Sequence, residues 1–278
     1  MTLLEVLRSS TSYLEKRKIE SPRLNAEHLL SHVLGQKRLE LYLGFENNLS
    51  ETQLVPLREL IRRRGQGEPL QHLLGTAEFC GHTFLSDKRA LVPRPETEEL
   101  VELLKSEIRN PKSEILDVGT GSGVIALSLA LHFPEAAVFG VDISEEALGL
   151  ARENARRLGL ADRVRFVPGN LLENLTERFD LIVANLPYVA MKDRSSLSRE
   201  VLHDPEVALF AGESGDELIH QLIEQAPARL QAGGWLALEI GNGQTERLCE
   251  LLRQKNYHDI QSKNDYSGTP RFLFTRYG

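Results

Sequence analysis

The spacing of apolar residues changes along the chain, and each change marks the border of a predicted part. In residues 1–66 apolar positions recur at intervals of three and four, as Leu54, Leu57 and Ile61 do, which is the period of helices that pack on one face. The arginines at positions 58 and 62–64 fall on the same helix, and we expect them to face water. The pattern predicts a bundle of helices.

Start and stop signals divide this first part into four or five helices. Thr2 and Ser50 each stand three residues before a Glu or Gln, which is the spacing of a capping box. Ser21 precedes Pro22, a residue favoured at the first helical position, and Gly35 follows the apolar run that it ends. We therefore predict a small N-terminal helical bundle over residues 1–66.

The helical period fails over residues 67–92. Phe79 and Phe84 lie in two short β-type runs, and Gly75 and Gly81 occur where the chain must turn. These features predict a β-hairpin that connects the bundle to a second domain, residues 93–278.

Strands and helices alternate through most of residues 93–278. Strands joined by helices predict a mostly parallel sheet that is covered on both faces, which is a Rossmann-like α/β fold. The last two strands have only a short turn between them, so we expect the last strand to be antiparallel. The expected strands are residues 114–118, 137–141, 164–167, 179–184, 235–240, 257–262 and 270–277, and the expected helices are residues 97–108, 145–158, 245–254 and one from about 122.

Composition narrows the class of protein. Of the 278 residues, 41% are apolar and 26% charged, as in globular proteins, and the length suits two domains. Lys and Arg number 33 against 40 Asp and Glu, and a net charge of −7 argues against broad binding of duplex nucleic acid. We find no apolar run near the ~20 residues of a membrane span and no N-terminal leader pattern. Cys80 and Cys249 lie far apart, so we expect a cytoplasmic protein. The eight histidines have no metal-binding spacing, so we expect no metal site.

A glycine-rich loop follows the strand expected at residues 114–118. Glycines at 119, 121 and 123 alternate with Thr120 and Ser122 and lead into an apolar helix, so backbone amides and a helix N-terminus can approach a ligand. Asp142 ends the next strand, 23 residues after the first of these glycines, where an acid can accept both hydroxyls of a ribose. The pair predicts a nucleoside site. The alternative is a tight turn followed by an N-terminal acid for the next helix.

A second candidate segment, Asn185, Leu186, Pro187 and Tyr188, follows the fourth strand at the sheet edge where open α/β sheets bind ligands. An asparagine side chain offers an acceptor and two donors, and Pro187 favours an extended Leu186 that can aim its carbonyl outward. Tyr188 adds a flat face. We expect this segment to lie opposite the glycine loop, and an ordinary polar turn is the alternative.

Together these motifs resemble those of a known family. The Asp-x-Gly-x-Gly-x-Gly loop, the acid after it and the Asn-x-Pro-Tyr segment are similar to those of class I S-adenosylmethionine-dependent methyltransferases that methylate planar amide or exocyclic amino nitrogens. Within that class the chain is most similar to the release factor glutamine methyltransferases, which share its helical N-terminal domain and the runs at residues 93–98, 205–209 and 238–241. The resemblance implies S-adenosylmethionine as cofactor, S-adenosylhomocysteine as product and peptide chain release factors as protein substrates.

The resemblance also implies roles for particular residues. The residues implied to bind the cofactor are Gly119, Thr120, Gly121, Ser122, Gly123, Asp142, Asn170, Leu171 and Asn185. The implied substrate clamp is Asn185, Leu186, Pro187 and Tyr188, in which the Asn185 side chain and the Leu186 backbone carbonyl are catalytic. The family usually has proline where this chain has Leu186, which keeps the carbonyl, and often has an aromatic residue where it has Leu91 and Leu171.

The implied reaction is transfer of a methyl group to the side-chain N5 of the glutamine in the Gly-Gly-Gln motif of release factors, with the N-terminal bundle recognising the substrate protein. Two alternatives stay open. One is an N6-adenine methyltransferase of DNA or RNA, against which the net charge of −7 argues, and the other is a non-catalytic module that binds release factors. We expect a monomer without membrane or duplex nucleic-acid contact, and a solvated loop at Asp204, Glu206 and Glu213 beside the substrate channel.

Overall fold

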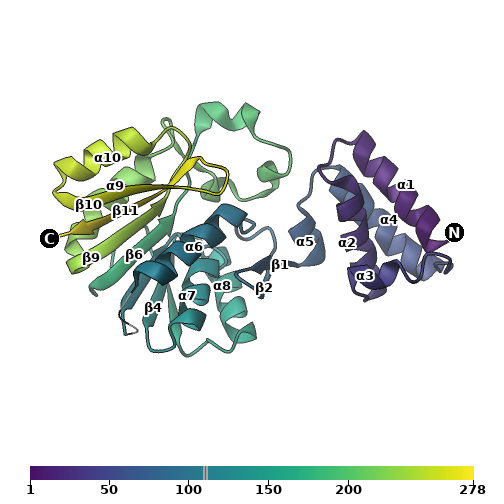
Figure 1. The fold of residues 1–278 in the computed structure, drawn as a ribbon, viewed down its shortest axis with the longest axis horizontal. Helices are drawn as coiled ribbons and strands as arrows, with labels where there is room; N and C mark the ends of the chain where they lie inside the picture. The colour runs from purple at the N-terminus through teal and green to yellow at the C-terminus, as the bar shows by residue number, and fades with distance from the viewer. Residues whose placement is uncertain (109, 111) are drawn as a thin grey trace. The chain divides into compact units, whose positions relative to one another are not determined.

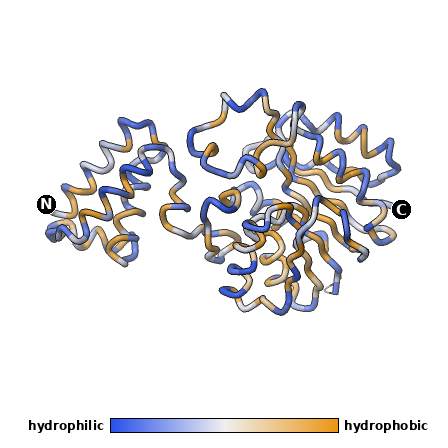
Figure 2. Tube along the Cα trace, turned by 180° about the vertical axis from the view of Figure 1, so that it is seen from behind, coloured by the Kyte–Doolittle hydropathy of each residue, from blue (hydrophilic) through white to orange (hydrophobic). Residues whose placement is uncertain are grey.

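The structure, a computed structural model shown in Figure 1, describes residues 1–108, 110 and 112–278. Contacts divide these described residues into two units. The first, called the N-terminal unit below, comprises Met1–Thr76 and the separate segment Ser198–His203. The second, called the sheet unit, comprises Ala77–Leu197 and Asp204–Gly278. Hydrophobic residues gather in the strands and on the inner faces of the helices (Figure 2), and no helix of the described chain is long and apolar enough to span a membrane.

Helices make up most of the N-terminal unit, as predicted for residues 1–66, but residues 70–74 also form a helix within residues 67–92, where we predicted only a β-hairpin. They are α1 (Leu3–Lys16), α2 (Pro22–Leu34), α3 (Arg38–Leu41), α4 (Glu51–Gly65) and α5 (Leu70–Leu74). The predicted capping box begins α1: the Glu5 N–H donates to the Thr2 hydroxyl at 3.3 Å, and the Thr2 N–H donates to the Glu5 carboxylate at 2.9 Å. Gly35 ends α2 in the left-handed conformation, with φ 62°. Leu14 and Leu29 are fully buried in the core between these helices.

Arg64 is buried, so the prediction that it faces water was wrong. It is 3% exposed, and its guanidinium donates to Asn25 Oδ1 at 2.6 Å, to Glu200 Oε2 at 2.6 Å and to the Glu68 carbonyl at 3.0 Å. These acceptors offset the free-energy cost of burying the guanidinium charge, because each replaces a hydrogen bond to water. Glu200 belongs to Ser198–His203, the distant segment that packs with the N-terminal unit.

The predicted hairpin forms from β1 (Thr76–Phe79) and β2 (His82–Leu85). Phe79 and Phe84 are 1% and 0% exposed, and their rings pack edge to face with centroids 6.0 Å apart. Both rings belong to the same apolar core as α6 (Pro95–Glu107) and α7 (Val124–His132). The hairpin therefore contributes to the core of the sheet unit.

A large sheet forms the sheet unit and confirms the predicted fold class. Its strand order is β10-β11-β9-β6-β3-β4-β5. Strands β9, β6, β3, β4 and β5 are parallel neighbours, whereas β11 is antiparallel to both β9 and β10, as predicted for the last strand. The strands are β3 (Glu114–Val118), β4 (Ala137–Asp142), β5 (Val164–Pro168), β6 (Phe179–Asn185), β9 (Leu230–Glu239), β10 (Tyr257–Asn264) and β11 (Pro270–Tyr277).

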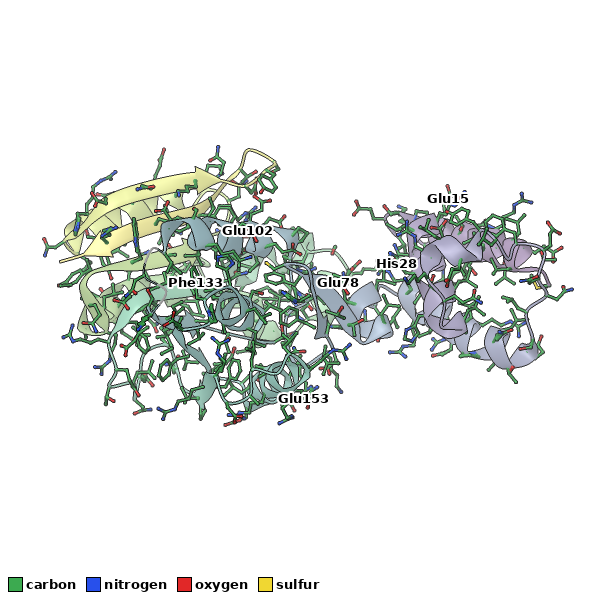
Figure 3. The ribbon with its side chains drawn as sticks, turned by 60° about the horizontal axis from the view of Figure 1, so that its bottom comes forward. Glu15, His28, Glu78, Glu102, Phe133 and Glu153 are labelled. Atoms are coloured by element: carbon green, nitrogen blue, oxygen red, sulfur yellow. The ribbon has the colours of Figure 1, made fainter. Side chains whose placement is uncertain are left out.

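Helices cover both faces of this sheet (Figure 1). Helices α6, α7 and α8 share one core with Ile115, and α9 and α10 share the other with Leu116, so adjacent residues of β3 face opposite cores. Glu102 on α6 and Glu153 on α8 lie on the outer sides of their helices (Figure 3). We did not predict α9, although its apolar residues have helical spacing. The helices are α6 (Pro95–Glu107), α7 (Val124–His132), α8 (Glu145–Arg157), α9 (Glu217–Gln225) and α10 (Thr245–Gln254).

Short elements connect β6 to α9. Strand β7 (Val189–Ala190) pairs in parallel with β8 (Phe210–Gly212). The 3-10 turns are η1 (Met191–Ser196), η2 (Val201–His203) and η3 (Glu206–Ala208), with η4 (Ala226–Ala228) after α9. This connection starts directly after the Asn-Leu-Pro-Tyr segment, so it borders the candidate site.

Candidate functional site

Most of the predicted site residues line one cavity at the carboxyl ends of the parallel strands, where open α/β sheets bind ligands. The predicted residues that line it are Gly119, Thr120, Gly121, Ser122, Asp142, Asn170, Leu171, Asn185, Leu186 and Pro187. Of the described site residues, Gly123 and Tyr188 lie outside its lining. Gly123 is the N-cap of α7, and Tyr188 lines an adjacent groove.

The glycine loop closely approaches both β4 and the Asn185 segment. The N–H groups of Gly119 and Thr120 donate to the Val141 carbonyl at 2.8 and 3.0 Å. Gly119 has φ +71°, and a Cβ built on it would lie 2.9 Å from Leu186 Cδ2. Both the backbone conformation and the close approach therefore require glycine at this position.

Asp142 ends β4 and faces the glycine loop. The Gly121 N–H donates to its Oδ2 at 2.8 Å, and the Ser144 N–H donates to its Oδ1 at 2.8 Å. Each carboxylate oxygen keeps a second lone pair, so the side chain can still accept two hydroxyl groups. Burial raises the pKa of Asp142 above its ordinary value, although the two backbone hydrogen bonds oppose the shift.

Asp117 begins the Asp-x-Gly-x-Gly-x-Gly motif and supports the glycine loop without lining the cavity, a role that we did not predict. It is fully buried, and its Oδ2 accepts from the Thr120 hydroxyl at 2.6 Å and the Ala126 N–H at 3.1 Å. Its Oδ1 is buried without a hydrogen-bond partner among the described residues. Burial raises the pKa of Asp117 to about 7. The carboxyl therefore ties the loop to α7 and keeps one acceptor unused.

Asn170 and Leu171 follow β5 and form another wall of the cavity. Leu171 is 6% exposed and has φ 52°, a left-handed conformation that costs a residue with a Cβ about 1–2 kcal/mol. Leu91 lines the same cavity. At these two leucines the wall is aliphatic, where the family often has aromatic residues.

Asn185 is held by two buried side chains from neighbouring elements. Its Nδ2 donates to Thr97 Oγ1 at 2.9 Å, and the Thr97 hydroxyl donates to Glu239 Oε2 at 2.8 Å. Asn185 and Glu239 are register partners at the ends of β6 and β9, and Thr97 lies in the first turn of α6. Burial raises the pKa of Glu239 to about 7, although Thr97 and the charge of Arg271 oppose the shift. We did not predict Thr97 or Glu239, although both lie in runs shared with the family.

Gln244 holds the far end of the Asn-Leu-Pro-Tyr segment. Its Nε2 donates to the carbonyls of Tyr188 at 3.3 Å and Gly215 at 2.9 Å, and its Oε1 accepts from the Gly241 N–H at 2.8 Å. Burial raises the pKa of Tyr188 to about 12, so its phenol stays neutral at physiological pH. We did not predict Gln244, because the Tyr188 and Gly215 carbonyls that it binds lie 56 and 29 residues away in sequence.

Asp204 is buried, so the expectation of a solvated loop was wrong for this residue, whereas Glu206 and Glu213 are exposed as expected. It is 4% exposed, its Oδ1 accepts from the Val92 N–H at 3.2 Å, and its Oδ2 accepts from the Arg94 guanidinium at 2.5 Å. The arginine charge compensates the buried carboxylate. Arg94 lines the cavity together with Pro205 and Val207, so Asp204 holds Arg94 at the cavity wall.

The fold and the site define a class I methyltransferase. The sheet is mostly parallel with an antiparallel strand, and the cavity is formed by a glycine loop, a strand-end acid and an Asn-x-Pro-Tyr segment. A methyltransferase domain family matches residues 109–267, and a PrmC N-terminal domain family matches residues 5–75. The chain is 41% identical over 277 residues to the release factor glutamine methyltransferase of Deinococcus radiodurans, covering 99% of each chain. It is 39% identical over 280 residues to that of Geobacter sulfurreducens, covering 100% of this chain and 97% of the relative. The chain belongs to the release factor glutamine methyltransferase family, as predicted, and it is an enzyme.

Solved structures agree with this fold class. A methyltransferase from Pyrococcus furiosus has a TM-score of 0.52 and 20% identity, covering 70% of this chain and 88% of that chain. A 16S rRNA methyltransferase of T. thermophilus, RsmC, in complex with AdoMet and guanosine, has a TM-score of 0.53 and 23% identity, covering 73% of this chain and 50% of that chain. At these identities the similarity shows the fold alone. Within residues 1–108, 110 and 112–278, no group of three or more His, Cys, Asp or Glu is placed to hold a metal ion.

Proposed function

We propose that this enzyme transfers a methyl group from S-adenosylmethionine to the side-chain N5 of the glutamine in the Gly-Gly-Gln motif of peptide chain release factors. One observation carries the proposal: Asn185 lines the same cavity as the glycine loop and Asp142, which brings an amide-binding side chain next to a nucleoside site. The names of its relatives support a release factor as the substrate.

The residues around the cavity fit S-adenosylmethionine. Gly119 leaves open a space that a Cβ would fill, and Asp142 can accept the two ribose hydroxyls. Leu91 and Leu171 offer apolar surface to the adenine. When bound, the cofactor supplies a methyl group on a positively charged sulfur.

Asn185 and Leu186 provide the catalytic acceptors. A glutamine nitrogen is a poor nucleophile, because its lone pair is delocalised into the carbonyl. As the nitrogen gains the methyl group, positive charge develops on it and its two hydrogens become stronger donors. The Asn185 side-chain oxygen and the Leu186 carbonyl accept these hydrogens and so bind the transition state more tightly than the ground state. One hydrogen then leaves to water as a proton when amide resonance is restored.

In this proposal the N-terminal unit, which matches the PrmC N-terminal domain family over residues 5–75, recognises the body of the release factor. Deleting residues 1–76 spares Phe79 and Phe84, which are needed in the core of the sheet unit. The deletion should raise KM for intact release factor far more than for a short Gly-Gly-Gln peptide. Equal increases for both substrates would contradict the assignment. The enzyme is expected to act as a cytoplasmic monomer, and sedimentation would measure its oligomeric state.

Mass spectrometry of release factor and of duplex DNA, each incubated with the protein and S-adenosylmethionine, tests the reaction. We expect one added methyl group on the glutamine of Gly-Gly-Gln and its loss with Asn185→Ala. Methylation of adenine alone would instead favour the nucleic-acid activity. No methylation of either substrate would favour a non-catalytic module that binds release factors.

A further inference from the structure

The orientation of the Asn185 amide decides whether its oxygen can accept from the substrate. The amide carries an acceptor oxygen on one side and an NH2 donor on the other, with nearly the same shape, so its hydrogen-bond partners determine which side faces the substrate. Asn185 donates to Thr97, which in turn donates to Glu239, and Thr97 and Glu239 are 3% and 1% exposed. Bulk water therefore competes little for their hydrogen bonds.

The protons available along these three side chains allow one orientation when Glu239 is charged. The carboxylate has no proton, so the Thr97 hydroxyl donates to it, at 2.8 Å. The Thr97 oxygen has then used its one hydrogen and can only accept, so it takes Nδ2 of Asn185, at 2.9 Å. The Asn185 Oδ1 is left to accept from the substrate nitrogen.

We propose that Thr97 and Glu239 are positioning residues, which hold the Asn185 amide with its oxygen available to the substrate. This inference rests on the proposed function, because it assumes that Asn185 binds the glutamine amide. The fold builds the arrangement from distant parts of the chain: strand pairing sets Glu239 beside Asn185, and the first turn of α6 supplies Thr97. A loss of either side chain should therefore affect turnover through Asn185.

Protonation of Glu239 would remove the constraint on the orientation of the Asn185 amide. A neutral carboxyl can donate to the Thr97 oxygen, and the Thr97 hydroxyl can then donate to Oδ1 of a flipped Asn185. The flip would turn the Asn185 NH2 toward the substrate NH2, and two donors cannot bond to each other. The active form of the site is therefore the one with Glu239 charged.

The surroundings of Glu239 place its protonation near neutral pH. Burial raises the pKa of Glu239 to about 7. Glu96 on α6 favours its protonated form, Arg271 on β11 favours its charged form, and Tyr188 faces it as a neutral phenol. We expect kcat to rise between pH 6 and pH 8 as Glu239 loses its proton.

Variants of Thr97 test the positioning role, with kcat and KM measured on a Gly-Gly-Gln peptide and cofactor affinity by calorimetry. Thr97→Val keeps the shape and removes the hydroxyl, so kcat should fall on the order of 10- to 100-fold with cofactor affinity retained. Thr97→Ser restores the hydroxyl and should restore most of kcat. Thr275→Val is the matched control: Thr275 is 1% exposed and its hydroxyl donates to the His258 carbonyl at 2.8 Å, away from the cavity. It should lose stability but keep kcat.

Glu239→Gln tests the proton dependence. A glutamine can offer Thr97 either an acceptor or a donor, so it no longer sets the orientation of Asn185. We expect a lower kcat in Glu239→Gln, without the rise between pH 6 and pH 8 that the wild type shows. Burial also raises the pKa of Asp117 to about 7, but Asp117 titrates in both proteins. The difference between the two profiles therefore belongs to Glu239.

The outcomes separate this inference from the proposed function. A wild-type kcat in folded Thr97→Val, or the wild-type pH profile in Glu239→Gln, would overturn the positioning role and leave the reaction intact. A wild type that does not methylate glutamine, or an Asn185→Ala variant that keeps its kcat, would overturn the function itself. Circular dichroism checks that each variant folds. If Glu239→Gln does not fold, a wild-type kcat that stays flat from pH 6 to pH 8 would still overturn the proton dependence.

Discussion

Replacing Gly119 by alanine should damage the site as well as the fold. Gly119 has φ +71°, a conformation that costs an alanine about 1–2 kcal/mol. The new Cβ would lie 2.9 Å from Leu186 Cδ2. Leu186 is buried and would have to move, and such overpacking costs about 1–3 kcal/mol. The expected loss in the free energy of unfolding is therefore about 2–5 kcal/mol.

Gly159 offers a matched control. It also has φ +71°, but nothing lies within 4 Å of a Cβ built on it. Gly159→Ala therefore carries the backbone cost alone, about 1–2 kcal/mol. The difference between the two variants isolates the contact of residue 119 with Leu186, about 1–3 kcal/mol.

Urea unfolding followed by Trp235 fluorescence measures both costs. Trp235 is the one tryptophan of the chain and lies in β9 with its ring 6.5 Å from that of Phe274, so it reports on the sheet unit. Calorimetry and kcat then measure the site. We expect Gly119→Ala to weaken cofactor binding and to lower kcat by about 10-fold or more, and Gly159→Ala to leave both unchanged. Equal unfolding losses with equal cofactor affinities would refute the reasoning.

Four other variants test the cofactor site, the N-terminal unit and the buried acids. Asp142→Ala removes charged hydrogen bonds worth about 1.5–3 kcal/mol, so calorimetry should show cofactor affinity reduced about 10- to 100-fold. Arg64→Ala leaves Glu200 without its arginine partner, and the 32% exposure of the Glu200 side chain lowers the cost of the unpaired charge. Hydrogen exchange should show the N-terminal unit destabilised by about 2–3 kcal/mol, and kcat on the peptide should be unchanged. Burial raises the pKa of Asp117 from 3.8 and the pKa of Glu239 from 4.5, each to about 7. The contribution of these two groups to the stability of the folded protein is therefore complete at low pH and is lost as pH rises toward 7. The free energy of unfolding, measured with urea, should fall less between pH 5 and pH 8 in Asp117→Asn and in Glu239→Gln than in the wild type.

Elements of the sheet unit could be predicted where the apolar period and local stop signals coincide. Strands β3 and β11 have the predicted bounds, Glu114–Val118 and Pro270–Tyr277, and α10 has the predicted Thr245–Gln254. In each case, turn residues or charged residues flank a short apolar pattern. Helix α9 has a similar pattern, but it lies between irregular segments, and we did not distinguish it from them.

Partners that are far apart in sequence could not be predicted. Arg64 and Asp204 were expected at the surface, where most charged residues lie. Each is buried because the fold brings it an opposite charge, Glu200 for Arg64 and Arg94 for Asp204, from positions 136 and 110 residues away. The glycine loop and Asn185 carry local motifs, whereas the side chains that hold Asn185 do not. The site residues were therefore predictable, but the contacts that orient them were not.

Leu186 stands where the family usually has proline, and contacts from outside the segment supply the rigidity that proline would give. Pro187 restricts the Leu186 backbone to extended conformations, and the Leu186 side chain is 4% exposed against Gly119. Gln244 holds the Tyr188 carbonyl at 3.3 Å. A proline at 186 would contribute about 0.4–1 kcal/mol through the unfolded chain, whereas truncating a buried leucine costs about 2–5 kcal/mol. Because packing is the larger effect, neighbouring residues can hold the Leu186 carbonyl in place, and leucine at this position is compatible with an active enzyme.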